Sequence, residues 1–142
     1  MIGKMRHAGI VVKDLEESLQ FYKLLGFKVD KQKQVRKPSG YVDTLLAGKN
    51  IELSILNLVA PDGSIIELLE CGKDRIEEKR ALLGIGLSHL AFTIRDIEEV
   101  YSKLSAEGVE FICPPQLSPN GYVKVVFCRA PEGSFLELVE IL

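Results

Sequence analysis

The sequence contains an internal repeat, in which a motif of the first half recurs in the second half. The first copy spans residues 7–17 and the second spans residues 89–99, which gives an offset of 82 (89 − 7). The same offset relates Gly26 to Gly108. Because a repeat of this kind indicates a duplicated structural unit, we expect two similar modules, each formed by about half of the chain.

The closing segments of the two copies match as well. Residues 60–68 and 130–138 share the pattern Ala-Pro-acid-Gly-Ser-apolar-apolar-Glu-Leu. Their offset is 70 (130 − 60), so the second copy lacks twelve residues (82 − 70) in its middle. The two modules should therefore be alike at their beginnings and ends and differ in their middle parts.

Each copy opens with the signals of a strand followed by a helix. Residues 6–13 predict a strand with apolar positions on both faces, and Asp14 and Gly26 predict the start and the end of the helix that follows. Asp96 and Gly108 hold the same places in the second copy. The apolar stripes predicted to be buried are Leu15, Ser18, Leu19 and Tyr22 in the first helix and Ile97, Val100, Tyr101 and Leu104 in the second.

After the helix, each copy shows the signals of three further strands. One strand is predicted at residues 27–35 in the first copy and at 109–113 in the second. Each copy then closes with a hairpin, around a Pro-Asp-Gly turn in the first copy and a Pro-Glu-Gly turn in the second. The hairpin arms are expected at residues 51–59 with 64–71, and at residues 122–129 with 134–141. Residues 41–48 fit either a short helix or an extra strand. Each module is thus predicted to be a β-α-β-β-β unit.

These elements predict an α+β fold of two tandem βαβββ modules. We expect their strands to form a curved, cup-shaped mixed sheet with the helices on the outside. Residues 1–142 would be a single domain, with the first module at 1–71, a charged linker helix within 72–86 and the second module at 87–142. The proline-containing loop at residues 114–121 would be either a lid over a cavity or a simple connection.

Composition limits the kinds of partner. Hydrophobic residues make up 46% of the chain, which is enough to form a buried core. The net charge is −2 and positive and negative residues are interspersed, so there is no basic surface for nucleic acid or for an anionic membrane. No segment has the pattern of a membrane span or a signal peptide, so we expect a cytoplasmic protein without membrane contact. The three cysteines lack metal-site or redox spacing, which indicates reduced and mostly buried thiols.

The two histidines of the chain, His7 and His89, occupy matching positions of the repeat. Strand alternation places each on a face with small neighbours. Glu67 and Glu137 also match, and each lies within an apolar strand, where a carboxylate is costly to bury unless it is paired or bound to a cation. A lone histidine near a strand start is usually an ordinary residue, but the matched positions favour one metal site formed by His7, Glu67, His89 and Glu137.

Two imidazole nitrogens and two carboxylate oxygens suit one divalent ion with open positions for water or substrate. Nickel, cobalt, zinc, manganese and ferrous iron all remain possible. Structural zinc sites usually recruit cysteines, which are absent from this set, so a catalytic site is the better interpretation. Glu70 and Glu140 also match, but they lie at strand ends on the opposite face, where we expect solvated carboxylates.

The sequence resembles the vicinal oxygen chelate superfamily, which includes glyoxalase I, methylmalonyl-CoA epimerase, fosfomycin-resistance enzymes, extradiol dioxygenases and bleomycin-binding proteins. The resemblance covers nearly the whole chain and is greatest to glyoxalase-like and epimerase-like members. It rests on the His7 module, the segment Phe21–Phe27, both Pro-x-Gly hairpins and the His89 module.

The resemblance implies that the metal binds adjacent oxygens of a small-molecule substrate. It also implies that an enediolate is stabilised while a glutamate moves a proton next to a carbonyl. In this interpretation Glu137 is the base and Glu67 is its counterpart in the first module. Glyoxalase I has an arginine and an asparagine for glutathione where this chain has Val11 and Cys71, which argues against glutathione as substrate.

The favoured function is therefore a metal-dependent lyase or isomerase, expected as a homodimer. The alternative is a metal-free binding or resistance protein that holds a small molecule in the same cup without chemistry. A transferase or a dioxygenase is less favoured, because extradiol dioxygenases need further histidines and this chain has none left.

Overall fold

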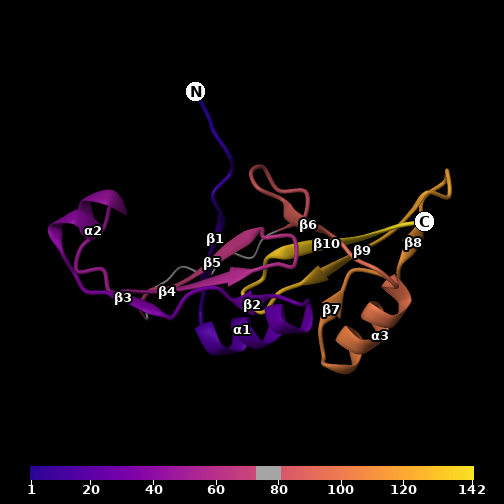
Figure 1. Cartoon of the computed structure of the whole chain (residues 1–142), viewed down its shortest axis with the longest axis horizontal. Helices are drawn as coiled ribbons and strands as arrows, with labels where there is room; N and C mark the ends of the chain where they lie inside the picture. The colour runs from indigo at the N-terminus through magenta and orange to yellow at the C-terminus, as the bar shows by residue number, and fades with distance from the viewer. Residues whose placement is uncertain (73–80) are drawn as a thin grey trace. The chain divides into compact units, whose positions relative to one another are not determined.

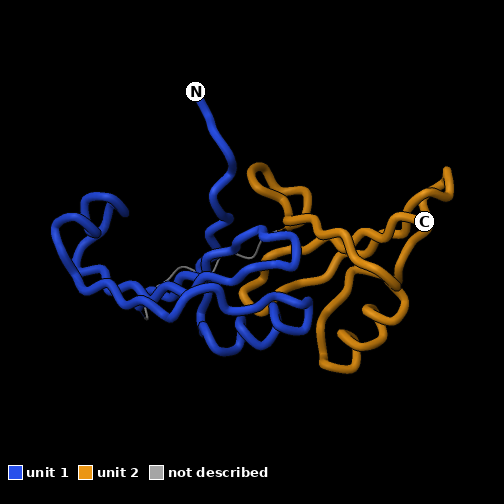
Figure 2. The backbone as a smooth tube through the Cα atoms, viewed as in Figure 1, with its two compact units in different colours: residues 1–77 blue, residues 78–142 orange. Residues whose placement is uncertain are grey.

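The structure is a computed structural model in which residues 1–72 and 81–142 are described (Figure 1). The chain forms two compact units, unit 1 at residues 1–77 and unit 2 at residues 78–142 (Figure 2). Most of the predicted linker helix lies outside the described residues. Its described end is a turn, in which the Gly84 N–H donates to the Ala81 carbonyl at 3.0 Å.

Unit 1 contains five strands and two helices among its described residues. They are β1 (Ala8–Val12), α1 (Leu15–Leu24), β2 (Lys28–Val29), β3 (Gln34–Arg36), α2 (Gly40–Leu45), β4 (Leu53–Val59) and β5 (Ile65–Glu70). The sheet order is β1-β5-β4-β2, with β1 parallel to β5 and the other pairs antiparallel. Because β3 also pairs with β4, the strand predicted at residues 27–35 is present as two short segments along one edge.

Unit 2 repeats this topology with a single helix in its described part. Its elements are β6 (His89–Thr93), α3 (Ile97–Ala106), β7 (Glu110–Phe111), β8 (Gln116–Leu117), β9 (Val123–Arg129) and β10 (Phe135–Ile141). The sheet order is β6-β10-β9-β7, and β8 also pairs with β9. Part of the loop predicted at residues 114–121 is therefore a strand. The predicted α+β class and the two βαβββ units are confirmed. Each unit has an open sheet, and a cup-shaped sheet formed by both units together stays a prediction.

The helices begin and end where the sequence predicts. Asp14 Oδ1 accepts the Glu17 N–H at 2.9 Å, and Asp96 Oδ1 accepts the Glu99 N–H at 3.1 Å. Both are N-caps, which satisfy a backbone donor that has no partner within the helix. The helices end close to Gly26 (φ 92°) and Gly108 (φ 83°), in the left-handed conformation that favours glycine after a helix.

Helices α1 and α3 each pack on one face of the sheet of their own unit (Figure 1). The predicted stripe of α1 is buried, whereas in α3 Ile97 and Leu104 are buried and the other two stripe residues are half-buried. Alternate strand residues complete each core, as Leu68 and Leu138 do with 0% exposure. The histidines and their glutamate partners lie on the opposite face of each sheet, which neither α1 nor α3 covers.

The ambiguous segment at residues 41–48 contains a helix, α2. It begins after Ser39, whose Oγ accepts the Val42 N–H at 3.3 Å, and the Asp43 carboxylate accepts the N–H groups of Asn50 and Ile51. This helix lies in the connection from β3 to β4, which in unit 2 is the short turn from β8 to β9. The twelve residues that the second copy lacks (82 − 70) therefore correspond to the region of α2.

None of the helices in the described parts of the chain combines the length and the hydropathy needed to cross a bilayer.

Candidate functional site

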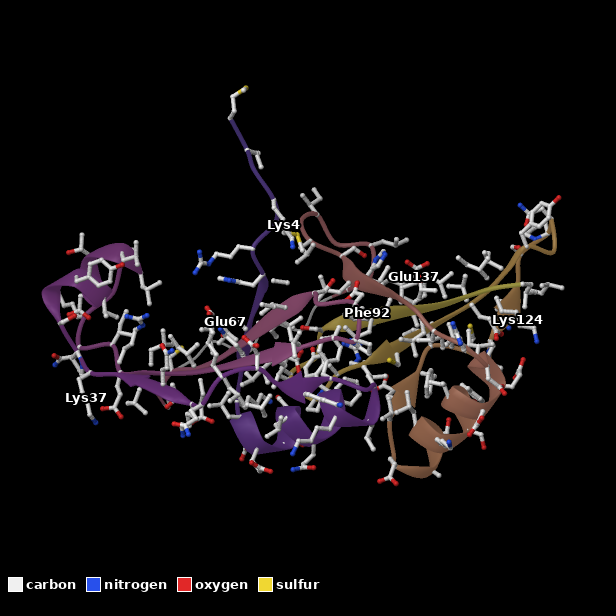
Figure 3. All side chains as sticks on the ribbon, viewed as in Figure 1. Lys4, Lys37, Glu67, Phe92, Lys124 and Glu137 are labelled. Carbon is white, nitrogen blue, oxygen red and sulfur yellow. The ribbon has the colours of Figure 1, made fainter. Side chains whose placement is uncertain are left out.

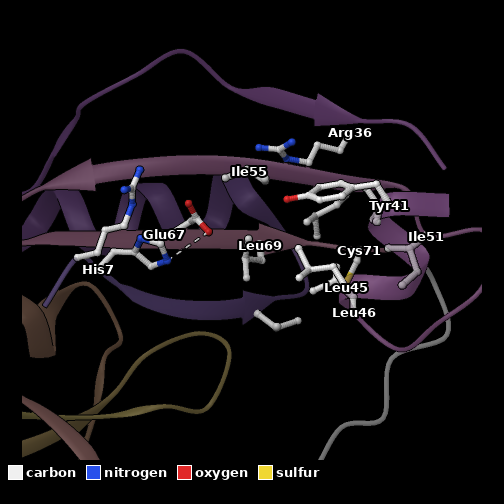
Figure 4. Close-up of a pocket in the computed structure, with 14 residues that line it drawn as sticks. His7, Arg36, Tyr41, Leu45, Leu46, Ile51, Ile55, Glu67, Leu69 and Cys71 are labelled. Carbon is white, nitrogen blue, oxygen red and sulfur yellow. Dashed lines mark ion pairs between the residues drawn. The ribbon is translucent and has the colours of Figure 1, made fainter. Parts of the chain in front are cut away.

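Unit 1 brings His7 and Glu67 together at the edge of its sheet. His7 directly precedes β1, and Glu67 lies on β5 opposite Gly9 of β1. His7 Nε2 and Glu67 Oε1 are 3.7 Å apart (Figure 4). The side chains are 33% and 21% exposed. They are therefore held by the sheet and remain accessible to a ligand.

Unit 2 forms the equivalent pair from His89 and Glu137. His89 is the first residue of β6, and Glu137 lies on β10 opposite Ala91. His89 Nε2 and Glu137 Oε2 are 3.1 Å apart, and both side chains are partly exposed. Figure 3 shows Glu67 and Glu137 in the same setting, each on the strand that pairs with the first strand of its unit.

Ser88 fixes which nitrogen of His89 carries hydrogen. The Ser88 hydroxyl donates to the Leu82 carbonyl at 2.6 Å, and Ser88 Oγ lies 3.0 Å from His89 Nδ1. Because the single hydroxyl hydrogen is already used, the Ser88 oxygen must accept the Nδ1 hydrogen of His89. In neutral His89, Nε2 is then an unprotonated electron-pair donor that faces Glu137.

The donor atoms of both pairs fit a divalent cation. In unit 2, the Nε2 atom of His89 and a carboxylate oxygen of Glu137 face each other at 3.1 Å, an arrangement in which the two atoms can share a cation. Two donors that bind one metal at about 2.1 Å lie about 3.0 Å apart at a right angle and about 3.4 Å apart at the tetrahedral angle. The 3.1 Å pair matches this spacing, and the 3.7 Å pair of unit 1 is slightly wider.

The structure thus pairs the four predicted ligands two by two. Within either unit, no third His, Cys, Asp or Glu of the described residues joins the pair with metal-site geometry. Convergence of His7, Glu67, His89 and Glu137 on one ion stays a prediction.

A cavity of about 500 Å³ adjoins the His7–Glu67 pair within unit 1. Its lining comes from β1, β3, β4, β5 and α2, so the helix found only in this unit forms one end of it (Figure 4). The apolar lining residues are Val11, Val42, Leu45, Leu46, Ile51, Leu53, Ile55 and Leu69. A cavity of this size and composition can hold a small organic molecule.

The polar groups of this cavity are largely cationic. Two of them, Arg6 and Arg36, carry a positive charge, and the single carboxylate of the lining is that of Glu67. The side chains of Arg6 and Arg36 make no ion pair or hydrogen bond within the described part of the chain. Their charge is therefore available to an anionic ligand.

Asn57 adds a polar group beside Glu67, because the two residues are directly paired across β4 and β5. Its Oδ1 atom is buried and has no hydrogen-bond partner among the residues that the structure describes. Buried polar atoms nearly always have a partner, so this position suits a water or a ligand group that donates a hydrogen bond. The matched residue in unit 2 is Phe127, which packs edge-on against the His89 ring at 5.1 Å.

Glu70 and Glu140 have a role that the sequence analysis missed. Glu70 Oε2 accepts the Leu15 N–H at 2.8 Å, and Glu140 Oε1 accepts the Asp96 N–H at 2.6 Å. Both carboxylates therefore cap the start of the helix on their own sheet, and the expectation that they are merely solvated was wrong. Their repetition at matching positions was the signal for this role.

Two other contributors left only weak signals in the sequence. Ser88 could have been noticed because it directly precedes a candidate ligand. The role of α2 could have been suspected from its apolar residues and from its absence in the second copy. Neither signal specifies the contact that the folded chain makes.

The cysteines do not supply a nucleophile or a ligand to the two pairs. Cys71 and Cys128 are buried and Cys113 is exposed, so the prediction of mostly buried thiols is confirmed, with Cys113 as the exception. Burial raises the pKa of the Cys128 thiol to about 12, which keeps it protonated and unreactive.

Comparison with known sequences gives two findings. A family model described as the Glyoxalase/Bleomycin resistance protein/Dioxygenase superfamily matches residues 4–138. The mitochondrial methylmalonyl-CoA epimerase of Dictyostelium discoideum is 31% identical over 144 residues, a match that covers 98% of this chain and 79% of that protein.

Solved structures with the same fold are also found. A glyoxalase family protein from Bacillus cereus matches with a TM-score of 0.89 at 22% identity, covering 100% of this chain and 96% of that one. A fosfomycin resistance protein from Listeria monocytogenes, crystallised with Mn(II) and sulfate, matches with a TM-score of 0.61 at 19% identity, covering 100% and 95%. At these identities the likenesses support the fold alone.

Proposed function

The chain belongs to the glyoxalase/bleomycin resistance protein/dioxygenase superfamily, and from this premise we propose that it is a divalent-metal-dependent lyase or isomerase. It would move a proton next to the carbonyl group of a small molecule. The observation that supports this proposal is the His–Glu pair that recurs in both units, 3.7 Å and 3.1 Å apart.

The ligands of the metal would be His7, Glu67, His89 and Glu137. When bound, the ion withdraws electron density from the substrate carbonyl and stabilises the negative charge that develops on its oxygen. Its identity among nickel, cobalt, zinc, manganese and iron is left open by a set of two nitrogens and two oxygens. Ser88 and Phe127 position the His89 ring, whose Nε2 faces Glu137.

Glu137 is proposed as the base, and Glu67 as its counterpart in unit 1. A carboxylate oxygen of Glu137 would accept the proton from the carbon next to the carbonyl and return it to the same or the neighbouring carbon. The partial burial of this carboxylate limits competing water while leaving room for the substrate. Return to the same carbon would make the chain an epimerase, as the Dictyostelium relative is named.

The substrate is proposed to be a small molecule other than a glutathione adduct. Val11 and Cys71, which stand where glyoxalase I carries its glutathione-binding arginine and asparagine, both line the cavity of unit 1. Neither side chain can bind a carboxylate as an arginine does. We further propose a homodimer, which light scattering of the purified protein would test.

The experiment that tests the proposal combines metal content with proton exchange. Purified protein, dialysed and reloaded with each candidate ion, is expected to hold one ion per chain by elemental analysis and to lose it in His7→Ala. Loaded protein in deuterated water should exchange the proton next to the carbonyl of a 2-oxo acid or an acyl thioester, and Glu137→Gln should abolish this exchange. Absence of stoichiometric metal in every preparation would overturn the proposal.

A second candidate function is binding without chemistry, and the apolar lining of the unit 1 cavity favours it. A binding or resistance protein of this kind would show a ligand-dependent rise in melting temperature. That rise would survive both a chelator and Glu137→Gln. A metal-dependent isomerase would instead lose its exchange activity under either condition.

A further inference from the structure

We propose that the unit 1 cavity binds a medium-chain amphiphilic anion, with its charged end at Arg36 and its apolar chain against α2. This deepens the proposed function, on which it rests for the reaction at the carbonyl end of the ligand. The binding site itself rests on the cavity lining of one unit and on the charge of Arg36, which has no ion pair among the described residues.

The charged end of the cavity is set by Arg36. It lines the cavity together with Glu67, and in Figure 4 its guanidinium points toward the side of the cavity that holds Glu67. The Arg36 side chain has no ion-pair or hydrogen-bond partner in the described parts of the chain. The adjacent Lys37, in contrast, pairs with Glu52 at 3.1 Å. Arg36 can therefore give a carboxylate two charge-assisted hydrogen bonds.

The apolar end is formed where Val42 of α2 joins a buried cluster with Leu53 and Ile55 of β4. Leu45 and Leu46 line the cavity from α2 and its C-terminus, and Ile51, Ile55 and Leu69 line it from the sheet side. Leu45 and Tyr41 remain 65% and 68% exposed although they line the cavity. An apolar chain laid against them would remove this surface from water, which is the main driving force for binding such a ligand.

The two ends define the class of ligand. The cavity of about 500 Å³ is lined at one end by His7 and Glu67 and at the other by residues of α2. A molecule that fills it would carry an oxygen-rich, negatively charged head and an apolar tail. A 2-oxo acid with a medium-length alkyl chain has both features, with its carbonyl next to the carboxylate.

The test measures binding by calorimetry in metal-free protein, with octanoate as an unreactive probe. Acetate keeps the charge without the chain, and 1-octanol keeps the chain without the charge. We expect octanoate to bind at least about tenfold more tightly than either. Arg36→Gln should weaken octanoate binding about five- to tenfold, and Leu45→Asp by more than tenfold.

Two matched variants control for these changes. Lys37→Gln removes the same charge one residue along the chain, and Leu24→Asp places a carboxylate at an exposed leucine outside the cavity. Both should bind octanoate as the parent does. Equal weakening by Arg36→Gln and Lys37→Gln would reduce the effect to net charge and overturn the inference.

Failure of this inference can be told apart from failure of the proposed function. If Glu137→Gln binds octanoate normally while metal binding and proton exchange are absent in the parent, the cavity stands and the proposed reaction fails. If metal binds but octanoate does not, the cavity inference is wrong. If octanoate does not bind and Leu45→Asp converts a dimer into a monomer by light scattering, the α2 surface is an interface between copies instead.

Discussion

Unit 1 and unit 2 share a topology and a His–Glu pair, but they differ in what surrounds that pair. In unit 2 the histidine is fixed by Ser88 and Phe127. In unit 1 the corresponding positions hold Arg6 and Asn57, and α2 closes one end of a cavity beside the pair. The two units thus share the His–Glu pair, while its surroundings differ: a hydrogen bond and an aromatic ring support the histidine in unit 2, and a cavity adjoins the pair in unit 1.

The largest expected effect separates the roles of the two glutamates. Glu137→Gln removes the proposed proton acceptor with little change of shape, and we expect the proton-exchange rate to fall about 10²- to 10⁴-fold at saturating metal. Glu67→Gln should chiefly weaken metal binding and lower the rate less once metal is saturating. Equal rate losses at saturating metal would show that the two units contribute alike and that Glu137 is not a dedicated base.

The next effect concerns the support of His89. Ser88→Ala removes the acceptor of the Nδ1 hydrogen, and loss of such a partner typically costs about 10- to 100-fold in metal affinity. The matched change in unit 1, Arg6→Ala, should leave metal affinity nearly unchanged because Arg6 makes no side-chain hydrogen bond within the described residues. Titration calorimetry gives the affinities, and nitrogen chemical shifts of the His89 ring should show the tautomer change only in Ser88→Ala.

A third pair of variants compares the helix caps. Glu140 accepts the N–H groups of both Asp96 and Ile97, whereas Glu70 accepts that of Leu15 alone. We expect Glu140→Ala to lower the free energy of unfolding by about 1–2 kcal/mol and Glu70→Ala by about 1 kcal/mol. Denaturant unfolding gives both values. If neither variant loses stability, the carboxylates are solvated as the sequence analysis expected.

Much of the fold follows from local sequence signals. Asp14 and Gly26 mark the first helix because side-chain capping and a left-handed residue are local requirements, and the repeat transfers the same reasoning to the second unit. The edge strands were predicted less well. β2 and β3 pair only with β4, and their break depends on this tertiary pairing rather than on their own residues.

The candidate site was predicted only in part, because some of its contacts follow from local patterns and others depend on tertiary packing. Each His–Glu pair follows from the repeat and from strand alternation, and within each unit the structure brings the two members of the pair together. The hydrogen-bond chain from Leu82 through Ser88 to His89 depends on where a turn places a carbonyl group. The cavity depends on how α2 packs. Neither this series of hydrogen bonds nor the cavity is specified by a local sequence pattern.

The smallest expected effect is a pH dependence of the first hairpin turn. Hydrogen bonds from the Ser64 backbone N–H and then from its hydroxyl lower the pKa of Asp62 below its usual value. A carboxylate whose pKa is lowered by folding stabilises the folded state above its unfolded-state pKa, and this contribution is lost as the pH falls through the lowered folded-state pKa. Asp62→Asn should therefore lower the melting temperature slightly near neutral pH, and the difference from the parent should shrink in acid.

Glu132→Gln changes the matched position of the unit 2 turn and shows whether a carboxylate stabilises both hairpin turns in this way. A difference for Asp62→Asn that stays constant from neutral to acidic pH would mean that the charge of Asp62 does not stabilise the turn.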